Sequence, residues 1–193
     1  IGNHLANAAR SKDWDVTLCD IDPAALERTR TSIYPSRYGD WDNAIQLCPV
    51  ADAPRGEFDW IFIGTPPDAH MSLALDAPDE RPKGILIEKP LATPDLAHCQ
   101  DVFERCEELG VRAFVGYDHA VSRSADRFCE LAGAVADVKT LDVSFREHWQ
   151  GIFNAHPWLS GPADTYLGYW TRGGGACGEH SHALNLWQNF SHV

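Results

Sequence analysis

The sequence lacks the features of membrane, nucleic-acid-binding and disulfide-rich proteins. It contains no run of about 18 apolar residues, so no membrane-spanning helix is expected. Basic residues are scarce, with 16 Lys and Arg against 28 Asp and Glu, which argues against a nucleic-acid partner because phosphate recognition needs clustered positive charge. The six cysteines form no Cys-x-x-Cys pair, which favours reduced thiols and a cytoplasmic location.

The composition is that of a globular protein. Hydrophobic residues make up 44% of the chain and charged residues 23%, so a core can form and disorder is excluded. No internal repeat and no low-complexity segment is present. The chain opens at Ile1, without an initiator methionine and already in a helical pattern, which indicates that further residues precede it and leaves a targeting signal undecided.

Strand and helix patterns alternate over the first two-thirds of the chain. This order predicts an α/β fold with a parallel sheet and crossover helices. Strands are expected at residues 16–19, 58–63, 84–87 and 111–115, and helices at 5–10, 23–30, 43–47, 71–75 and 93–109.

The pattern changes after about residue 124. A helix is expected at 125–131, and the alternating segment 138–149 is typical of a strand in an open sheet. Residues 151–172 are rich in aromatics, glycine and proline, and a helical pattern runs from 179 to 190. Trp170, in the aromatic stretch, could stack on a sugar or nicotinamide ring, or it could simply cover a sheet.

Two apolar strands end in polar, proline-containing turns. Residues 84–87 run into Glu88-Lys89-Pro90, and residues 58–63 run into the segment 64–70. Two charges at the end of a buried strand cost free energy unless a site uses them. Ligands of parallel α/β sheets bind outside the carboxyl ends of the strands, so these turns predict a binding edge.

A nucleotide could bind at the amino-terminal end. Asp20 follows the first strand, where an acid accepts hydrogen bonds from the ribose hydroxyls of NAD; a helix cap or turn is the alternative. A carboxylate there would repel a 2′-phosphate, which favours NAD over NADP. Gly2 could be the last glycine of a G-x-G-x-x-G motif, since Asp20 lies near the expected spacing of about 20 residues; otherwise it is an isolated glycine.

The glycines at 173–175 precede a segment with three interpretations. If residues 179 onward are helical, Glu179, His182 and Asn185 share one face, so Glu179 could orient His182 as a general base. The segment could instead be a glycine-rich turn before a helix with surface histidines. In a third interpretation His180, His182 and Glu179 ligate iron or zinc. The base is our working hypothesis, and no metal is expected.

Four segments in this order resemble the Gfo/Idh/MocA oxidoreductases, the family of glucose–fructose oxidoreductase and inositol dehydrogenase. They are residues 65–70, 88–92, 115–119, and the glycines 173–175 with a following histidine. The resemblance implies a Rossmann-type doubly wound domain over residues 1–120, then a partial α+β domain over 121–193 with an open, mainly antiparallel sheet. It also implies a homo-oligomer.

The resemblance implies an NAD(P)-dependent dehydrogenase for a sugar, polyol or related secondary alcohol. Lys89 would stabilise the substrate oxygen and lower the pKa of its partner, and His182 would take the hydroxyl proton with Glu179 in support. The cofactor would contact Gly2, Asp20, Thr65, Pro66, His70 and Glu88, and the substrate would contact His119, Trp170 and Arg172. A redox-neutral NAD-dependent glycosidase and a non-catalytic NAD-binding regulator are the alternatives.

Two positions depart from the family pattern. Gly178 stands where the family often has an aspartate four residues before the histidine, and Ala120 stands where an arginine is common. The family's strand order of 3-2-1-4-5-6 would also place an absent strand between residues 16–19 and 58–63. We therefore expect the isolated chain not to fold as a stable domain.

Overall fold

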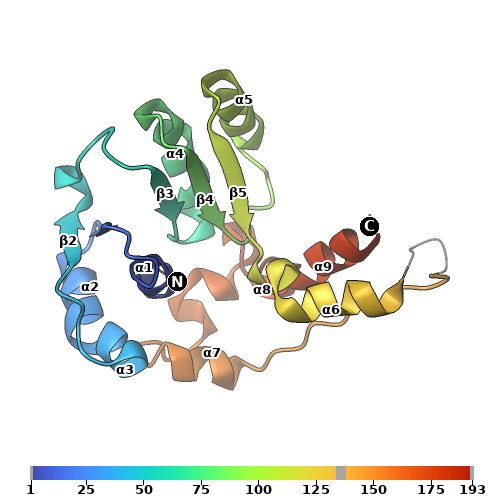
Figure 1. Ribbon diagram of the computed structural model, residues 1–193. Coiled ribbons are helices and arrows are strands. Elements are labelled where there is room, and N and C mark those ends of the chain that lie inside the picture. Colours follow the sequence, from blue (N-terminus) through green and yellow to red (C-terminus); the bar gives the residue numbers. More distant parts are fainter. Residues whose placement is uncertain (1, 134–137, 192–193) are drawn as a thin grey trace.

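The computed structural model describes residues 2–133 and 138–191 (Figure 1). Its strands are β1 (Val16–Asp20), β2 (Ile45–Pro49), β3 (Trp60–Ile63), β4 (Gly84–Glu88) and β5 (Arg112–Gly116). Its α-helices are α1 (Gly2–Arg10), α2 (Pro23–Arg28), α3 (Tyr34–Tyr38), α4 (Pro67–Asp76), α5 (Cys99–Leu109), α6 (Arg123–Ala132), α7 (Trp149–Ala155), α8 (Gly175–Glu179) and α9 (Ser181–Ser191). Short 3-10 and π-helical turns join several of them.

The five strands form two separate parallel sheets. β1 pairs with β2, and β3, β4 and β5 form the second sheet in that order. Within the described ranges β1 and β3 therefore each pair with one strand. The four strands expected from the sequence are all present, and the parallel pairing with intervening helices confirms the α/β class.

Helices α4 and α5 cover one face of the larger sheet. Ile63, Ile85 and Ile87 belong to a buried cluster with apolar residues of both helices, including Met71 and Val102. Ile85 and Ile87 are 0% and 1% exposed, and full burial of such a side chain stabilises the fold by about 1.5–3 kcal/mol. This core fixes the carboxyl ends of β3 and β4, which carry the polar turns.

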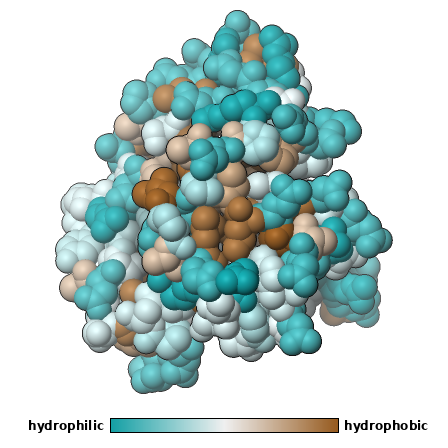
Figure 2. Space-filling view, turned by 90° about the vertical axis from the view of Figure 1, so that its left-hand side faces the viewer, coloured by the Kyte–Doolittle hydropathy of each residue, from teal (hydrophilic) through white to brown (hydrophobic). Residues whose placement is uncertain are grey.

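The opposite face of this sheet is more open. Phe62, Leu86 and Phe114 are register partners across the three strands, and the two phenylalanines are 37% and 42% exposed. On the side of the molecule that bears β2 and α2, Figure 2 shows an apolar patch surrounded by hydrophilic residues. The described chain thus leaves apolar surface uncovered.

The prediction of a helix at 43–47 is wrong, because residues 45–47 already belong to strand β2. Asp42 forms a turn in which its side chain accepts a hydrogen bond from the Ala44 N–H and its carbonyl accepts one from the Ile45 N–H. Ile45 is buried while Gln46 is exposed, the two-residue alternation of a strand. Five residues are too few to distinguish the helical period from the strand period, so the pairing with β1 decides that this segment is a strand.

The carboxyl-terminal part also differs from the prediction. Residues 138–148 form no strand, because alternation makes a strand only where a partner supplies hydrogen bonds, and no described segment pairs with them. The helix expected at 179–190 is divided between α8 and α9, which are separated by His180. The helix expected from residue 93 begins at Cys99. Among the described helices none is both long and apolar enough to cross a bilayer.

Candidate active site

A buried histidine ties together the turns that follow β3 and β4. His70, from α4, is 0% exposed. Its Nε2 lies 2.7 Å from the carbonyl oxygen of Thr65, and its Nδ1 lies 3.1 Å from that of Pro90. The ring was expected to line the cofactor cleft, but its burial places it behind the turns, where it holds them in position. Thr65 and Pro66 are exposed, as a cofactor contact requires.

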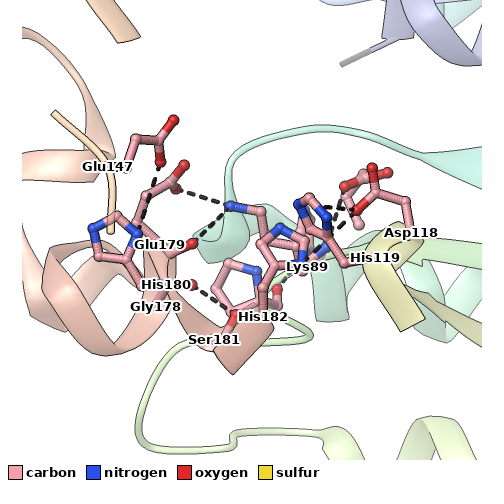
Figure 3. A network of polar contacts seen from close by, with 12 residues as sticks. Lys89, Asp118, His119, Glu147, Gly178, Glu179, His180, Ser181 and His182 are labelled. Atoms are coloured by element: carbon pink, nitrogen blue, oxygen red, sulfur yellow. Dashed lines mark hydrogen bonds and ion pairs between the residues drawn. The ribbon is translucent and has the colours of Figure 1, made fainter. Parts of the chain in front are cut away.

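Lys89 reaches from the β4 turn to a segment far away in the sequence. Its Nζ donates a hydrogen bond to the carbonyl oxygen of Glu179 at 3.1 Å and forms an ion pair with Glu179 Oε2, also at 3.1 Å (Figure 3). The two side chains are 14% and 19% exposed. An ion pair so shielded from solvent holds its geometry better than a surface pair, so the ammonium position is well defined.

The glycines before α8 allow this contact. Gly173 has φ +88°, and a Cβ there would lie 2.6 Å from Cβ of Pro67, next to the β3 turn. At Gly178 a Cβ would lie 1.8 Å from the carbonyl oxygen of Gly173. Only glycine permits both approaches. The departure from the family pattern at Gly178 therefore follows from local packing, and it brings Glu179 to Lys89.

We predict that Gly178→Ala lowers the free energy of unfolding by about 3 kcal/mol, because the new methyl group must displace a backbone carbonyl. Urea denaturation of the protein at its natural full length, monitored by circular dichroism, measures the change. The matched control is Gly151→Ala in α7, where a Cβ would meet nothing within 4 Å and alanine should be neutral or stabilising. Equal stability of Gly178→Ala and the wild type would contradict the packing described here.

His182 is the second chemically important side chain. It lies in the first turn of α9, is 7% exposed, and contacts the rings of Tyr117, His119 and Phe145. Its Nδ1 is buried and has no hydrogen-bond partner within residues 2–133 and 138–191; the nearby Asp118 Oδ1 lies 3.8 Å away.

The surroundings of His182 keep its ring neutral. Burial lowers its pKa to about 4, the charges of Lys89 and His119 add to the effect, and Asp118 opposes it. The charge of Lys89 thus acts in the direction expected from the sequence, although burial is the larger cause. At neutral pH the imidazole is uncharged and can accept a proton.

The expected pairing of Glu179 with His182 is not formed. Glu179 ends α8 and its carboxylate pairs with Lys89, whereas His182 belongs to the next helix. His180, between them, points to Glu147, with 3.7 Å between Nδ1 and Oε2. The three side chains of the zinc or iron interpretation therefore have different neighbours and do not converge. Glu179 positions Lys89 instead of orienting His182.

The amino-terminal candidates lie on the smaller sheet and on helix α1. Asp20 ends β1, and its Oδ1 accepts a hydrogen bond from the Asp22 N–H at 2.9 Å. Asp22 caps α2 by accepting from the Ala24 N–H. The helix cap is therefore Asp22, and Asp20 takes the turn role that was the alternative to a nucleotide contact. Gly2 begins α1, and a Cβ there would meet nothing within 4 Å.

Glu88 lies at the end of β4, beside Gly116 of β5. A Cβ at Gly116 would lie 2.8 Å from Glu88 Oε1, so the glycine leaves room for the carboxylate. Burial raises the pKa of Glu88, while the adjacent Lys89 N–H favours its charged form. The carboxylate is therefore held close to the strand ends, as a contact to a bound ligand requires.

The three predicted substrate residues lie in different surroundings. The side chain of His119 is 47% exposed and its ring touches that of His182. Trp170 is 69% exposed. Arg172 Nε donates to Asp68 Oδ2 at 2.7 Å, which joins the aromatic segment to α4. His119 is labelled in the polar network of Figure 3, beside His182.

The sequence interpretation missed two residues near this network. Asp118 faces both His119 and His182 and was quoted only as part of a motif; its place directly after β5 was the available signal. Tyr166 is the other, and burial raises the pKa of its phenol, with the carboxylates of Glu179, Glu88 and Asp68 adding to the effect. No local pattern distinguished Tyr166 from the neighbouring aromatic residues.

Comparison with solved structures supports the fold. An NAD-binding oxidoreductase from Klebsiella pneumoniae aligns with 91% of this chain and 43% of its own, at 19% identity and a TM-score of 0.51. A levoglucosan dehydrogenase, solved in complex with NADH and levoglucosan, aligns with 98% of this chain and 50% of its own, at 16% identity and a TM-score of 0.60. The chain thus spans half or less of these proteins, and a likeness at such identity concerns the fold alone.

Comparison by sequence identifies the family. A search of curated proteins found no match. The model of an oxidoreductase family with an NAD-binding Rossmann fold matches residues 2–117, more than half of the chain. This region includes β1 to β5 and the turns that carry Thr65, Glu88 and Lys89. The chain therefore belongs to the Gfo/Idh/MocA oxidoreductases.

Proposed function

We propose that this protein is an NAD(P)-dependent dehydrogenase that oxidises a secondary alcohol of a sugar, polyol or related compound. The observation that carries the proposal is that Lys89, held by Glu179, lies close enough to His182 for its charge to lower the pKa of the ring (Figure 3). A fixed ammonium and a buried, neutral imidazole with a free nitrogen are the two groups that alcohol oxidation requires. A regulator that only bound the cofactor would need neither.

The chain's own residues divide the chemistry between them. Nδ1 of His182 accepts the proton of the substrate hydroxyl, because this buried nitrogen has no hydrogen-bond partner among the described residues. Nζ of Lys89 stabilises the negative charge that develops on the substrate oxygen, and Glu179 holds the ammonium in place. His119 contacts the substrate beside His182, while Trp170 and Arg172 stay more distant candidates.

The amino-terminal and strand-end residues fit a nicotinamide dinucleotide. Gly2 lies in the first turn of α1, where a Cβ would meet nothing within 4 Å, so a pyrophosphate could approach its backbone. Asp20 suits a ribose without a 2′-phosphate, so NAD is preferred. Thr65 and Pro66 are exposed beside the sheet edge, and Glu88 would face the nicotinamide ribose. When bound, the nicotinamide supplies the hydride acceptor.

An assay of cofactor balance tests the proposal. The protein, expressed at its natural full length and purified, is incubated with NAD or NADP and a panel of sugars and polyols, and NADH formation is followed by absorbance. Parallel reactions contain aryl glycosides. We expect stoichiometric NADH with at least one free sugar or polyol, and faster turnover with NAD. Aglycone release without net NADH would indicate the redox-neutral glycosidase, and NAD binding without turnover on either panel would indicate a regulator.

A further inference from the structure

Three potential metal ligands meet where β5 ends and α9 begins. Asp118 and His119 open the 3-10 turn Asp118–Val121 that follows β5, and His182 comes from the first turn of α9 (Figure 3). Asp118 Oδ1 lies 3.9 Å from His119 Nε2 and 3.8 Å from His182 Nδ1. One ligand atom from each residue lies within 4.8 Å of the other two. Among the described residues this is the one such group.

We propose that Asp118, His119 and His182 bind a divalent transition-metal ion of the Zn²⁺ class. Two imidazoles and one carboxylate are a donor set for zinc, cobalt or iron, whereas magnesium and calcium prefer oxygen ligands. Three protein ligands leave a coordination position for water or another small ligand, as in open zinc sites. This set shares only His182 with the His180-containing set considered from the sequence.

The three side chains can close around an ion with little rearrangement. Tetrahedral zinc with bonds of about 2.1 Å holds its ligand atoms about 3.4 Å apart, so the present atoms need to approach by roughly 0.5–1.5 Å. The side chains of Asp118 and His119 are 80% and 47% exposed and can rotate without repacking the core. His182, at 9%, provides the fixed ligand.

The unpartnered nitrogen of His182 is an independent indication of a ligand. Its Nδ1 is buried and has no hydrogen-bond partner in the part of the chain that the structure describes, although buried polar atoms normally have one. Phe145 lies against both imidazoles, with ring centroids 5.3 Å from each, and shields this side of the group from water. The ammonium of Lys89 belongs to the same network, but its charge is balanced by Glu179.

Metal binding would compete with the acid–base role of His182, a consequence that rests on the function proposed above. An ion at Nδ1 occupies the electron pair that would otherwise accept the hydroxyl proton. Metal and substrate proton would then exclude each other at one atom. The binding proposal itself depends only on the three ligands.

A metal titration without nicotinamide or substrate tests the proposal. The protein, expressed at its natural full length and purified, is treated with a chelator and freed of it. It is then titrated with CoCl₂, whose visible absorbance reports ligation, and bound Co²⁺ is displaced with ZnCl₂. We expect one ion per chain. Asp118→Asn and His119→Ala should each weaken binding by at least about 100-fold, since even changes outside the ligand shell cost 10–100-fold. Both residues are exposed, so the variants should fold, which circular dichroism checks.

His98→Ala is the matched control. His98 also pairs with an aspartate, with 2.9 Å between its Nδ1 and Asp101 Oδ2, but it is exposed, and the described residues offer no third ligand beside it. Its removal should leave the affinity unchanged. No cobalt spectrum in the wild type, or equal affinity in the wild type and both ligand variants, would overturn the proposal. Because the titration contains no substrate, its failure is distinct from a failure of the dehydrogenase assay.

Discussion

Replacing Lys89 by alanine is expected to lower kcat/KM for alcohol oxidation by roughly 10²–10³-fold, the usual effect of removing one group that stabilises a developing oxyanion. The ammonium is held in the network by two contacts with Glu179, and a methyl group can replace neither its charge nor its position. NAD affinity should change little, because the proposed cofactor contacts are other side chains. Initial rates of NADH formation and calorimetric titration with NAD measure the two effects.

Lys83→Ala is the matched control for this variant. Lys83 precedes β4 at the opposite end of the same strand, is 69% exposed and pairs with Asp59 at 2.6 Å. Its removal should leave turnover unchanged. Undiminished turnover of Lys89→Ala would refute the role of the lysine, whereas loss of NAD binding together with activity would point to a general disruption of the strand ends.

His182→Asn is expected to lower kcat by roughly 10²–10⁴-fold, because general-base assistance is lost. The pH dependence of the wild type should carry the signature of this residue. A base acts when it is unprotonated, so activity falls as the pH drops through its pKa. Burial and the charge of Lys89 lower that pKa to about 4, so activity should persist well below pH 6.5, the ordinary value for histidine. Rates measured between pH 3.5 and 8 test this.

Two comparisons separate a base from a structural residue. In Lys89→Ala the residual activity should begin to fall at a higher pH than in the wild type. The reason is that one of the charges that lower the pKa of His182 is gone. His180→Asn is the neighbouring control, since His180 faces Glu147 and should affect kcat only slightly. An acid limb that is identical in the wild type and in His182→Asn would assign the titration to another group.

The pattern of apolar runs and polar turns predicted strands of the three-stranded sheet, because each run and each turn can be recognised from a few consecutive residues. Residues 58–63 and 84–87 are apolar runs bounded by turns, and such strands are stabilised by burial on the helix-covered face. The turn at Lys89 was correctly placed at a strand end for the same reason. The family resemblance supplied the roles of Lys89 and His182, which local pattern alone left open.

The errors came where partners decide the structure. Residues 45–49 became β2 because β1 pairs with them, and residues 138–148 show no strand because no described segment does. The prediction that Glu179 and His182 share one helical face was wrong, because the helix is interrupted at His180. That interruption follows a contact between the backbones of Gly173 and Gly178, which no helical periodicity contains. The meeting of Asp118 with His182 is likewise a product of tertiary packing.

The buried ring of His70 makes the turns after β3 and β4 mechanically dependent on each other. Because it contacts the carbonyl oxygens of Thr65 and Pro90 at once, a displacement of one turn is transmitted to the other. Substitutions at Thr65 and Glu88 should then be non-additive in a double-mutant cycle, although the two side chains belong to different loops. The two turns thus move as one unit, so that cofactor affinity and the position of the Lys89 ammonium change together.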